Sequence, residues 1–241
     1  FYPMGGGAGI VKAMTTAIKK LGGEIRTGVG VRKILLEEKG KKKSAVGVEL
    51  ENGEQLKADR VVSNADPHQT YHKMIGVENL SKKLQAKLTK TTYSVTSLML
   101  FITVDIDVRK AGMDSGNIWM MRDKDMDELF REMSGLDILI DDEFPAVFIS
   151  CSSLKDPASY NGHYHNIEVV TYIKYESFSK FENEATVRSE KYQQYKERIG
   201  EKLLNNLEKV LPTLRNHIVQ MDVSTPITNE FYIRATKGNV Y

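Results

Sequence analysis

Histidines and one cysteine are the residues of this 241-residue chain best suited to metal binding or nucleophilic catalysis. His68 and His72 stand four positions apart, the spacing at which two imidazoles on one helical face can share a metal ion. Their surroundings supply no clear third ligand, so we interpret the pair as part of a surface helix. His163 and His165 lie near Gly162 and are interpreted as part of an exposed loop. The sequence therefore predicts no bound metal.

Nucleophilic and acid–base catalysis also lack a recognisable set of residues. Cys151 lies in a strand-like run without a base nearby, and the chain has no Gly-x-Ser-x-Gly motif to present a nucleophilic serine. The acidic run at residues 141–143 is expected to be a solvated turn rather than a catalytic carboxylate pair. We therefore nominate no catalytic side chain.

Composition narrows the classes of protein. The 34 Lys and Arg residues nearly balance the 32 Asp and Glu residues, so charge does not favour a nucleic-acid partner. The best apolar run, residues 98–104, has strand length and falls short of the about 18 residues that a membrane-spanning helix needs. One cysteine fits a reducing compartment, and we expect a cytoplasmic protein.

A helix is the first element that the pattern predicts. Residues 8–21 place Ile10, Met14, Ile18 and Leu21 on one helical face, and a Gly-Gly pair ends the helix. The glycines before it do not follow the Gly-x-Gly-x-x-Gly spacing. We interpret them as a tight entry to the helix rather than as a phosphate-binding loop.

A three-stranded antiparallel meander follows the helix. The charged run at residues 39–43 predicts one hairpin tip, and Asn52-Gly53 predicts a type I′ turn. Period-two alternation places the three strands at residues 25–31, at residues 46–50 and from Gln55 onward.

A strand and a helix are predicted to meet just after the meander. Residues 60–63 form a short apolar run without alternation, which is typical of a strand covered on both faces. Asp66 and Pro67 suit the cap and the first position of a helix. In open α/β sheets such junctions bind ligands, because free amide groups and the helix dipole face the crevice.

The rest of the chain has few helices between its strands. This pattern predicts a mixed or antiparallel sheet, separate from the nucleotide-binding part, in an α+β chain of two domains. Strands are predicted at residues 94–108, 116–121, 146–152, 166–175 and 217–223, and helices at residues 80–88, 123–133 and 183–211.

Several segments resemble, in the same order, the bacterial phytoene desaturase family of FAD-dependent oxidoreductases, which includes carotenoid isomerases and retinol saturases. The segments are YPMGGGAGIVKAMTTAIKKLGGEI, VGVRKILLEEKG, AVGVELENGE, VVSNADPHQTY, SSLKDPASYNGHYHN and TPITNEFYIRATKGNVY. The resemblance is dense over residues 2–76 and thin between about residues 91 and 146. It implies a central piece of such a protein, without the glycine-rich FAD segments of either end.

The resemblance implies FAD as the cofactor of the full-length protein, with weak binding at most to this piece alone. In this superfamily the residue that matches Val31 places its backbone against the adenine, although periodicity alone would make Val31 a core strand residue. Asn64, Ala65 and Asp66 match the loop that closes over the cofactor, and their alternative is a helix cap alone. The implied domains are residues 1–76 for FAD binding, 77–222 for substrate binding and 223–241 returning to the FAD domain.

Met99, Phe101, Trp119, Met120 and Met121 are candidates for an apolar substrate channel. Thioether and aromatic side chains suit a long flexible hydrocarbon. For each residue, ordinary core packing is the alternative.

The resulting hypothesis is the substrate-binding region of an FAD-dependent oxidoreductase that desaturates, isomerises or saturates a carotenoid-like polyene or another apolar substrate. The absence of a catalytic side-chain set agrees with a cofactor that performs the redox step itself. Two alternatives remain: an amine-oxidase-like flavoenzyme with a polar substrate, and a non-catalytic module that binds apolar ligands. The expected partners are an apolar small molecule and, through it, a membrane surface, with no nucleic acid.

Overall fold

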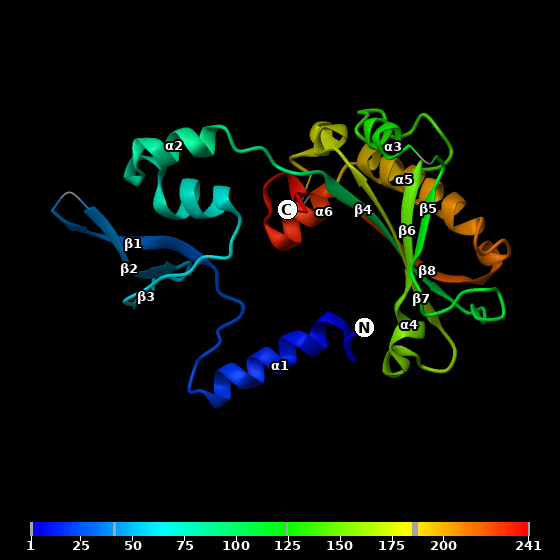
Figure 1. Cartoon of the computed structure of the whole chain (residues 1–241), viewed down its shortest axis with the longest axis horizontal. Coiled ribbons are helices and arrows are strands. Elements are labelled where there is room, and N and C mark those ends of the chain that lie inside the picture. Colours follow the sequence, from blue (N-terminus) through cyan, green and yellow to red (C-terminus); the bar gives the residue numbers. More distant parts are fainter. Residues whose placement is uncertain (1, 41, 124, 185–187, 241) are drawn as a thin grey trace. The chain divides into compact units, whose positions relative to one another are not determined.

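The structure, a computed structural model, describes residues 2–40, 42–123, 125–184 and 188–240. Helices and antiparallel sheets make up the chain (Figure 1), which confirms the predicted α+β class. Contacts divide it into two units. Unit 1 comprises Phe1–Thr16, Ser94–Ile233 and Lys237–Tyr241, and unit 2 comprises Ala17–Tyr93 and Arg234–Thr236.

Unit 2 is built on the predicted meander. Its sheet has the order β1-β2-β3, formed by β1 (Val31–Lys39), β2 (Lys42–Leu50) and β3 (Gln55–Lys57). The helical segment η1 (His68–Ile75) packs against β1, whose Ile34 is buried. After it come η2 (Val77–Asn79) and α2 (Lys82–Thr89).

Two predictions for the meander are wrong in detail. The first strand begins at Val31 rather than at Ile25, because Gly28 has φ +75°, outside the range of a strand, and β2 ends at Leu50, opposite Val31. The turn after β2 is not of type I′, since Gly53 alone of the Asn52-Gly53 pair has a positive φ, of +87°.

The strand predicted at residues 60–63 is also absent. The segment has no regular secondary structure, and Val62 is 94% exposed. A strand requires a neighbour to accept and donate its backbone hydrogen bonds. Among the described residues none of the strands lies beside this segment.

Unit 1 contains a five-stranded antiparallel sheet of order β5-β6-β7-β4-β8. A mixed or antiparallel sheet was predicted for this part of the chain. The strands are β4 (Thr96–Val104), β5 (Ile118–Met121), β6 (Ala146–Cys151), β7 (His165–Ile173) and β8 (Ile218–Ser224).

One face of this sheet, the core face, forms the hydrophobic core of unit 1. On β4 the alternate residues Leu98 and Leu100 are fully buried. Helix α5 (Glu190–Glu208) packs against β4 and β8 and buries Ile199, Leu203 and Leu207 completely (Figure 1). The apolar period predicted for this helix is therefore confirmed.

Helix α5 is shorter at its start than the predicted helix over residues 183–211. The hydroxyl of Ser189 accepts a hydrogen bond from the backbone N–H of Tyr192 and so caps the helix there. Residues 185–187 of the predicted helix lie outside the described residues.

The remaining helical elements of unit 1 are short. The predicted helix at residues 123–133 is confirmed as α3, which starts slightly later. These elements are α3 (Met126–Met133), α4 (Ser152–Lys155), η3 (Pro157–Ser159), η4 (Tyr175–Phe181), η5 (Leu214–His217), α6 (Pro226–Ile233) and η6 (Thr236–Gly238), whose first residue belongs to unit 2.

Helix α1 (Gly6–Lys20) confirms the first predicted helix and has residues in both units. Gly5 and Gly6 have positive φ values, and a Cβ atom on Gly9 would lie 2.3 Å from the carbonyl oxygen of Met4. The glycines thus form the tight helix entry that we expected. Across the described residues, helices with the length and apolar character needed to span a bilayer are absent.

Candidate functional site

The second face of the unit 1 sheet, called here the open face, carries four of the five predicted channel residues. Trp119 of β5, Phe148 of β6, Val170 of β7 and Met99 of β4 follow one another across neighbouring strands. The indole of Trp119 contacts the ring of Phe148 edge-on, with ring centroids 4.8 Å apart. A row of apolar side chains therefore crosses four strands.

Exposure distinguishes the channel candidates. Trp119 is 64% exposed, Met121 45% and Phe101 42%, and Met99 is partly buried. Met120 points to the core face and packs against the core, because strand alternation sends it away from its two neighbours. An uncovered apolar surface of this kind is typical of a ligand or partner site.

Glu168 of β7 is the partly buried carboxyl group on the open face. It lies opposite Phe101 of β4 and opposite Ser150 of β6. Burial raises the pKa of Glu168, against the nearby charge of Lys155 and a hydrogen bond from Ser152, which lower it. The ammonium of Lys155 itself donates to the carbonyl oxygens of residues 115 and 116, at 2.6 and 3.2 Å.

The predicted cofactor residues lie in unit 2. Asp66 caps η1 as predicted, since its Oδ1 atom accepts from the backbone N–H groups of His68 and Gln69 at 2.8 and 3.3 Å. The backbone N–H and the hydroxyl of Thr236 also donate to this carboxylate. Burial acts to raise the pKa of Asp66, but the hydrogen bonds from Thr236 and the cap outweigh it and lower the pKa.

The other three predicted cofactor residues, Val31, Asn64 and Ala65, are at least partly exposed. Val31 is half-buried at the start of β1, and Asn64 and Ala65 are exposed immediately before η1, which packs against β1. The unpaired backbone at residues 60–63 continues this open surface. The first N–H groups of η1 are occupied by the carboxylate of Asp66, so the exposed backbone before the helix is what this surface offers to a ligand.

His165 contradicts the prediction of an exposed loop. It is 4% exposed at the start of β7, its Nδ1 atom lies 2.9 Å from the hydroxyl of Ser153, and that hydroxyl lies 3.4 Å from the Sγ atom of Cys151. Tyr160 stacks on its ring at 4.4 Å. Burial lowers the pKa of His165 and raises the pKa of Cys151. These groups are closed to a substrate and stabilise the strand end.

The other histidine pair stacks without forming a metal site. The rings of His68 and His72 lie 4.5 Å apart, and burial followed by the neighbouring His72 lowers the pKa of His68. Among the described residues, groups of three or more His, Cys, Asp or Glu placed to hold a metal ion are absent.

Two buried polar residues of α5 were not singled out from the sequence. Lys202 is 6% exposed, donates to the carbonyl oxygen of Ile138 at 2.7 Å and lies over the ring of Phe144. Asn206 binds both the backbone N–H and the carbonyl of Phe144 at 2.9 Å. Both residues hold the loop before β6 onto α5. Their positions on the apolar face of the predicted helix were the sequence signal that could have identified them as buried.

Comparison with curated proteins finds relatives along the whole chain. An all-trans-retinol 13,14-reductase of Danio rerio is 28% identical over 250 residues, which cover 100% of this chain and 40% of that protein. Prolycopene isomerase 2 of an Oncidium hybrid cultivar is 27% identical, covering 98% of the chain and 37% of that protein. An inactive all-trans-retinol 13,14-reductase of Danio rerio is 25% identical, covering 94% and 38%. The chain thus spans about 40% of the length of these relatives.

A solved structure and a family model complete the comparison. An oxidoreductase from Methanosarcina mazei superposes with a TM-score of 0.56 at 19% identity, covering 93% of this chain and 43% of that one, so it shows the fold. The model of the flavin containing amine oxidoreductases matches residues 1–127. More than half of the chain therefore carries the family pattern, and the chain belongs to the flavin containing amine oxidoreductase family, whose cofactor is FAD.

Proposed function

We propose that this chain is the substrate-binding region of an FAD-dependent oxidoreductase that desaturates, isomerises or saturates a polyene or a similarly apolar substrate. The observation that carries the proposal is the open face, where exposed Phe101, Trp119 and Met121 gather with partly buried Met99 on one side of the sheet. The relatives named for retinol and prolycopene, both polyenes, support this substrate class.

The two units suggest a division of labour. Within the predicted substrate domain, residues 77–222, the open face would bind and orient an apolar chain and keep water from it. Val31, Asn64, Ala65 and Asp66 of unit 2 would hold FAD, which supplies the redox chemistry when bound. The predicted domain limits and these residue roles are part of the proposal.

The test is the visible spectrum of the full-length, FAD-loaded protein during anaerobic addition of candidate polyenes. Bleaching of the flavin absorption by a polyene supports the proposal. Bleaching by small amines alone would favour the amine-oxidase-like alternative, which the name of the matched family supports. A protein that takes up a polyene but no FAD would favour the non-catalytic alternative, which an inactive relative supports.

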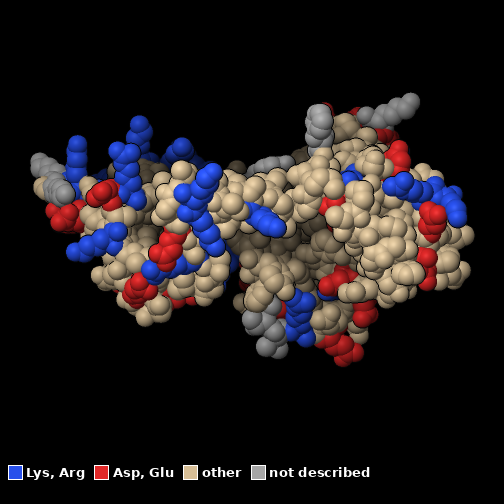
Figure 2. Space-filling view, turned by 90° about the horizontal axis from the view of Figure 1, so that it is seen from below, with Lys and Arg blue, Asp and Glu red and all other residues tan. Residues whose placement is uncertain are grey.

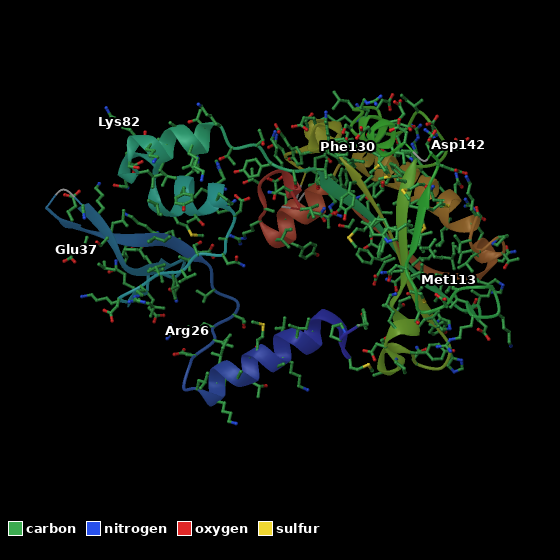
Figure 3. All side chains as sticks on the ribbon, viewed as in Figure 1. Arg26, Glu37, Lys82, Met113, Phe130 and Asp142 are labelled. Atoms are coloured by element: carbon green, nitrogen blue, oxygen red, sulfur yellow. The ribbon has the colours of Figure 1, made fainter. Side chains whose placement is uncertain are left out.

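A peripheral contact with a membrane is a further part of this proposal, together with a cytoplasmic location. Unit 2 carries more Lys and Arg than Asp and Glu residues, and its basic side chains stand out from the surface in Figure 2. Lys43 of β2 donates to Asn79 at 2.7 Å, which joins the hairpin to the segment before α2. In α2 itself Lys82 (labelled in Figure 3) and Lys87 are exposed. Basic surfaces of this kind attract anionic lipid headgroups.

Liposome sedimentation tests the contact. Vesicles that contain phosphatidylserine should carry the protein down, and pure phosphatidylcholine vesicles should not. A Lys82→Glu/Lys87→Glu variant should lose binding, whereas a Lys110→Glu variant, with an exposed lysine of unit 1, should keep it. Equal sedimentation with both kinds of vesicle would contradict the contact, and so would a protein that sediments with neither.

A further inference from the structure

We propose that Glu168 makes the open face selective for an apolar chain that ends in a hydroxyl group over a pure hydrocarbon of the same shape. This inference rests on the proposed function of the open face and goes further by naming the polar end of its substrate. The residue would act as a specificity determinant in substrate binding, without a part in the redox step.

The position of Glu168 is fixed by strand register. In β7 the residues Ile167 and Val169 on either side of it are buried in the core, so alternation turns Glu168 to the open face. Phe101 lies opposite it on β4, and Val170 is the next open-face residue along β7. The carboxyl group therefore borders the apolar row rather than standing apart from it.

Beyond Glu168 the open face becomes polar. Ser150 faces Glu168 from β6, and Ser152 at the start of α4 contributes a hydrogen bond to the carboxyl group. Phe148, two residues before Ser150, already belongs to the apolar row. On β6 and β7 the face thus changes from apolar to hydrogen-bonding side chains between one open-face position and the next.

Glu168 is also available for a ligand. The nearby cation Lys155 acts on Glu168 through its charge, but its ammonium donates hydrogen bonds to the backbone of residues 115 and 116. By contrast Asp222, a residue of β8 that also lies on the open face of the sheet, pairs with Lys196 at 2.8 Å. In the described part of the chain, the ion pairs within 4.0 Å do not include Glu168.

A hydrocarbon laid over this carboxyl group would strip it of water and give no hydrogen bond in return. A hydroxyl group at the end of the chain would instead supply one. Partial burial also raises the pKa of Glu168, which disfavours a site that depends on its charge, such as one for an ammonium group. The chemical class is therefore an apolar polyene with a terminal alcohol.

The experiment measures binding to the full chain by the fluorescence anisotropy of the polyene itself. The probes are all-trans-retinol, the hydrocarbon that lacks its hydroxyl group, and the corresponding primary amine. The variants are Glu168→Leu, which removes the hydrogen bond, and Glu168→Gln, which keeps a polar amide in its place. Glu197→Gln, an exposed carboxylate of α5 on the other side of the sheet, is the matched control.

The wild type and Glu197→Gln should bind the alcohol about tenfold more tightly than the hydrocarbon, the value of one hydrogen bond. Glu168→Leu should abolish this preference while still binding the hydrocarbon, and Glu168→Gln should restore part of it. Equal affinity for alcohol and hydrocarbon in the wild type would overturn the inference and leave the proposed function standing. Tighter binding of the amine, lost in Glu168→Gln, would also overturn it. If neither polyene bound, the proposed function itself would fail.

Discussion

Asp66 and Thr236, separated by 170 positions in the sequence, are joined by two hydrogen bonds. The carboxylate of Asp66 accepts from the backbone N–H of Thr236 at 3.1 Å and from its hydroxyl group at 2.7 Å. The same carboxylate caps η1. One side chain thus holds the returning segment at residues 234–236 against the N-terminus of η1 within unit 2.

Replacing Asp66 with Ala should destabilise unit 2 by about 1.5–3 kcal/mol, the range for hydrogen bonds to a charged group. Because the fold lowers the pKa of Asp66 below its ordinary 3.8, this stabilisation is full above that pH and is lost as the pH falls through the folded-state pKa. Urea unfolding at neutral pH measures the effect. Asp59→Ala, an exposed aspartate of the same unit, should change the stability by less than about 0.5 kcal/mol. Equal losses in the two variants would contradict the role of Asp66.

Met120 and Met121 are adjacent but face opposite sides of the sheet, which makes them a matched pair. Met120→Ala should cost about 2–3 kcal/mol of stability, because its side chain packs against the core. Met121→Ala should leave stability nearly unchanged and weaken polyene binding, since its side chain lies on the open face. Thermal unfolding and a binding titration of both variants separate the two effects. A loss of binding without a loss of stability in Met120→Ala would reverse the assignment of faces.

Asn206 supplies both partners of the buried Phe144 backbone. Asn206→Ala leaves an N–H and a carbonyl unsatisfied in the core and should cost about 2–4 kcal/mol. Its neighbour Asn205, half-buried and bound to the carbonyl of Asp142, should cost less than about 1 kcal/mol when changed to Ala. Denaturant midpoints of the two variants test this, and indistinguishable midpoints would show that the Asn206 bonds contribute little.

His165 should make the stability of unit 1 depend on pH. Burial lowers its pKa from the ordinary 6.5, so the unfolded chain takes up the proton first as the pH falls. Stability is therefore full above about pH 6.5 and declines below it. His165→Gln should flatten this part of the stability profile relative to the wild type, and His163→Gln, an exposed histidine, serves as the control. An unchanged slope in His165→Gln would exclude His165 as the cause.

Local sequence patterns predicted most of the helices and strands. The predictions that failed are strands for which the fold provides no partner strand. Alternation located β2, strand-like runs located the five strands of unit 1, and the i+4 period located the buried face of α5. The same alternation at Ile25, Thr27 and Val29 gave no strand, because β2 is too short to reach them. The run at residues 60–63 formed no strand because none of the described strands lies beside it. Local sequence does not show whether a pairing partner is present.

The candidate site was predictable in part. Residue type indicated the apolar open face, and counting two residues at a time from Trp119 would have removed Met120 from it. The alternation of Ile167, Val169 and Ile173 would likewise have placed His165 inside the core. Thr236 could not be matched to Asp66 in this way, since only the folded chain brings these residues together.

The most direct test of the open face as a substrate site is the fluorescence of Trp119, the single tryptophan of the chain. Polyenes absorb where tryptophan emits, so a polyene bound on this face takes up the excitation of the indole. We predict saturable quenching by all-trans-retinol, and weaker binding in Phe101→Asp, which places a charge on the open face. Quenching that does not saturate, or that is identical in wild type and Phe101→Asp, would contradict the assignment of the open face as the substrate site.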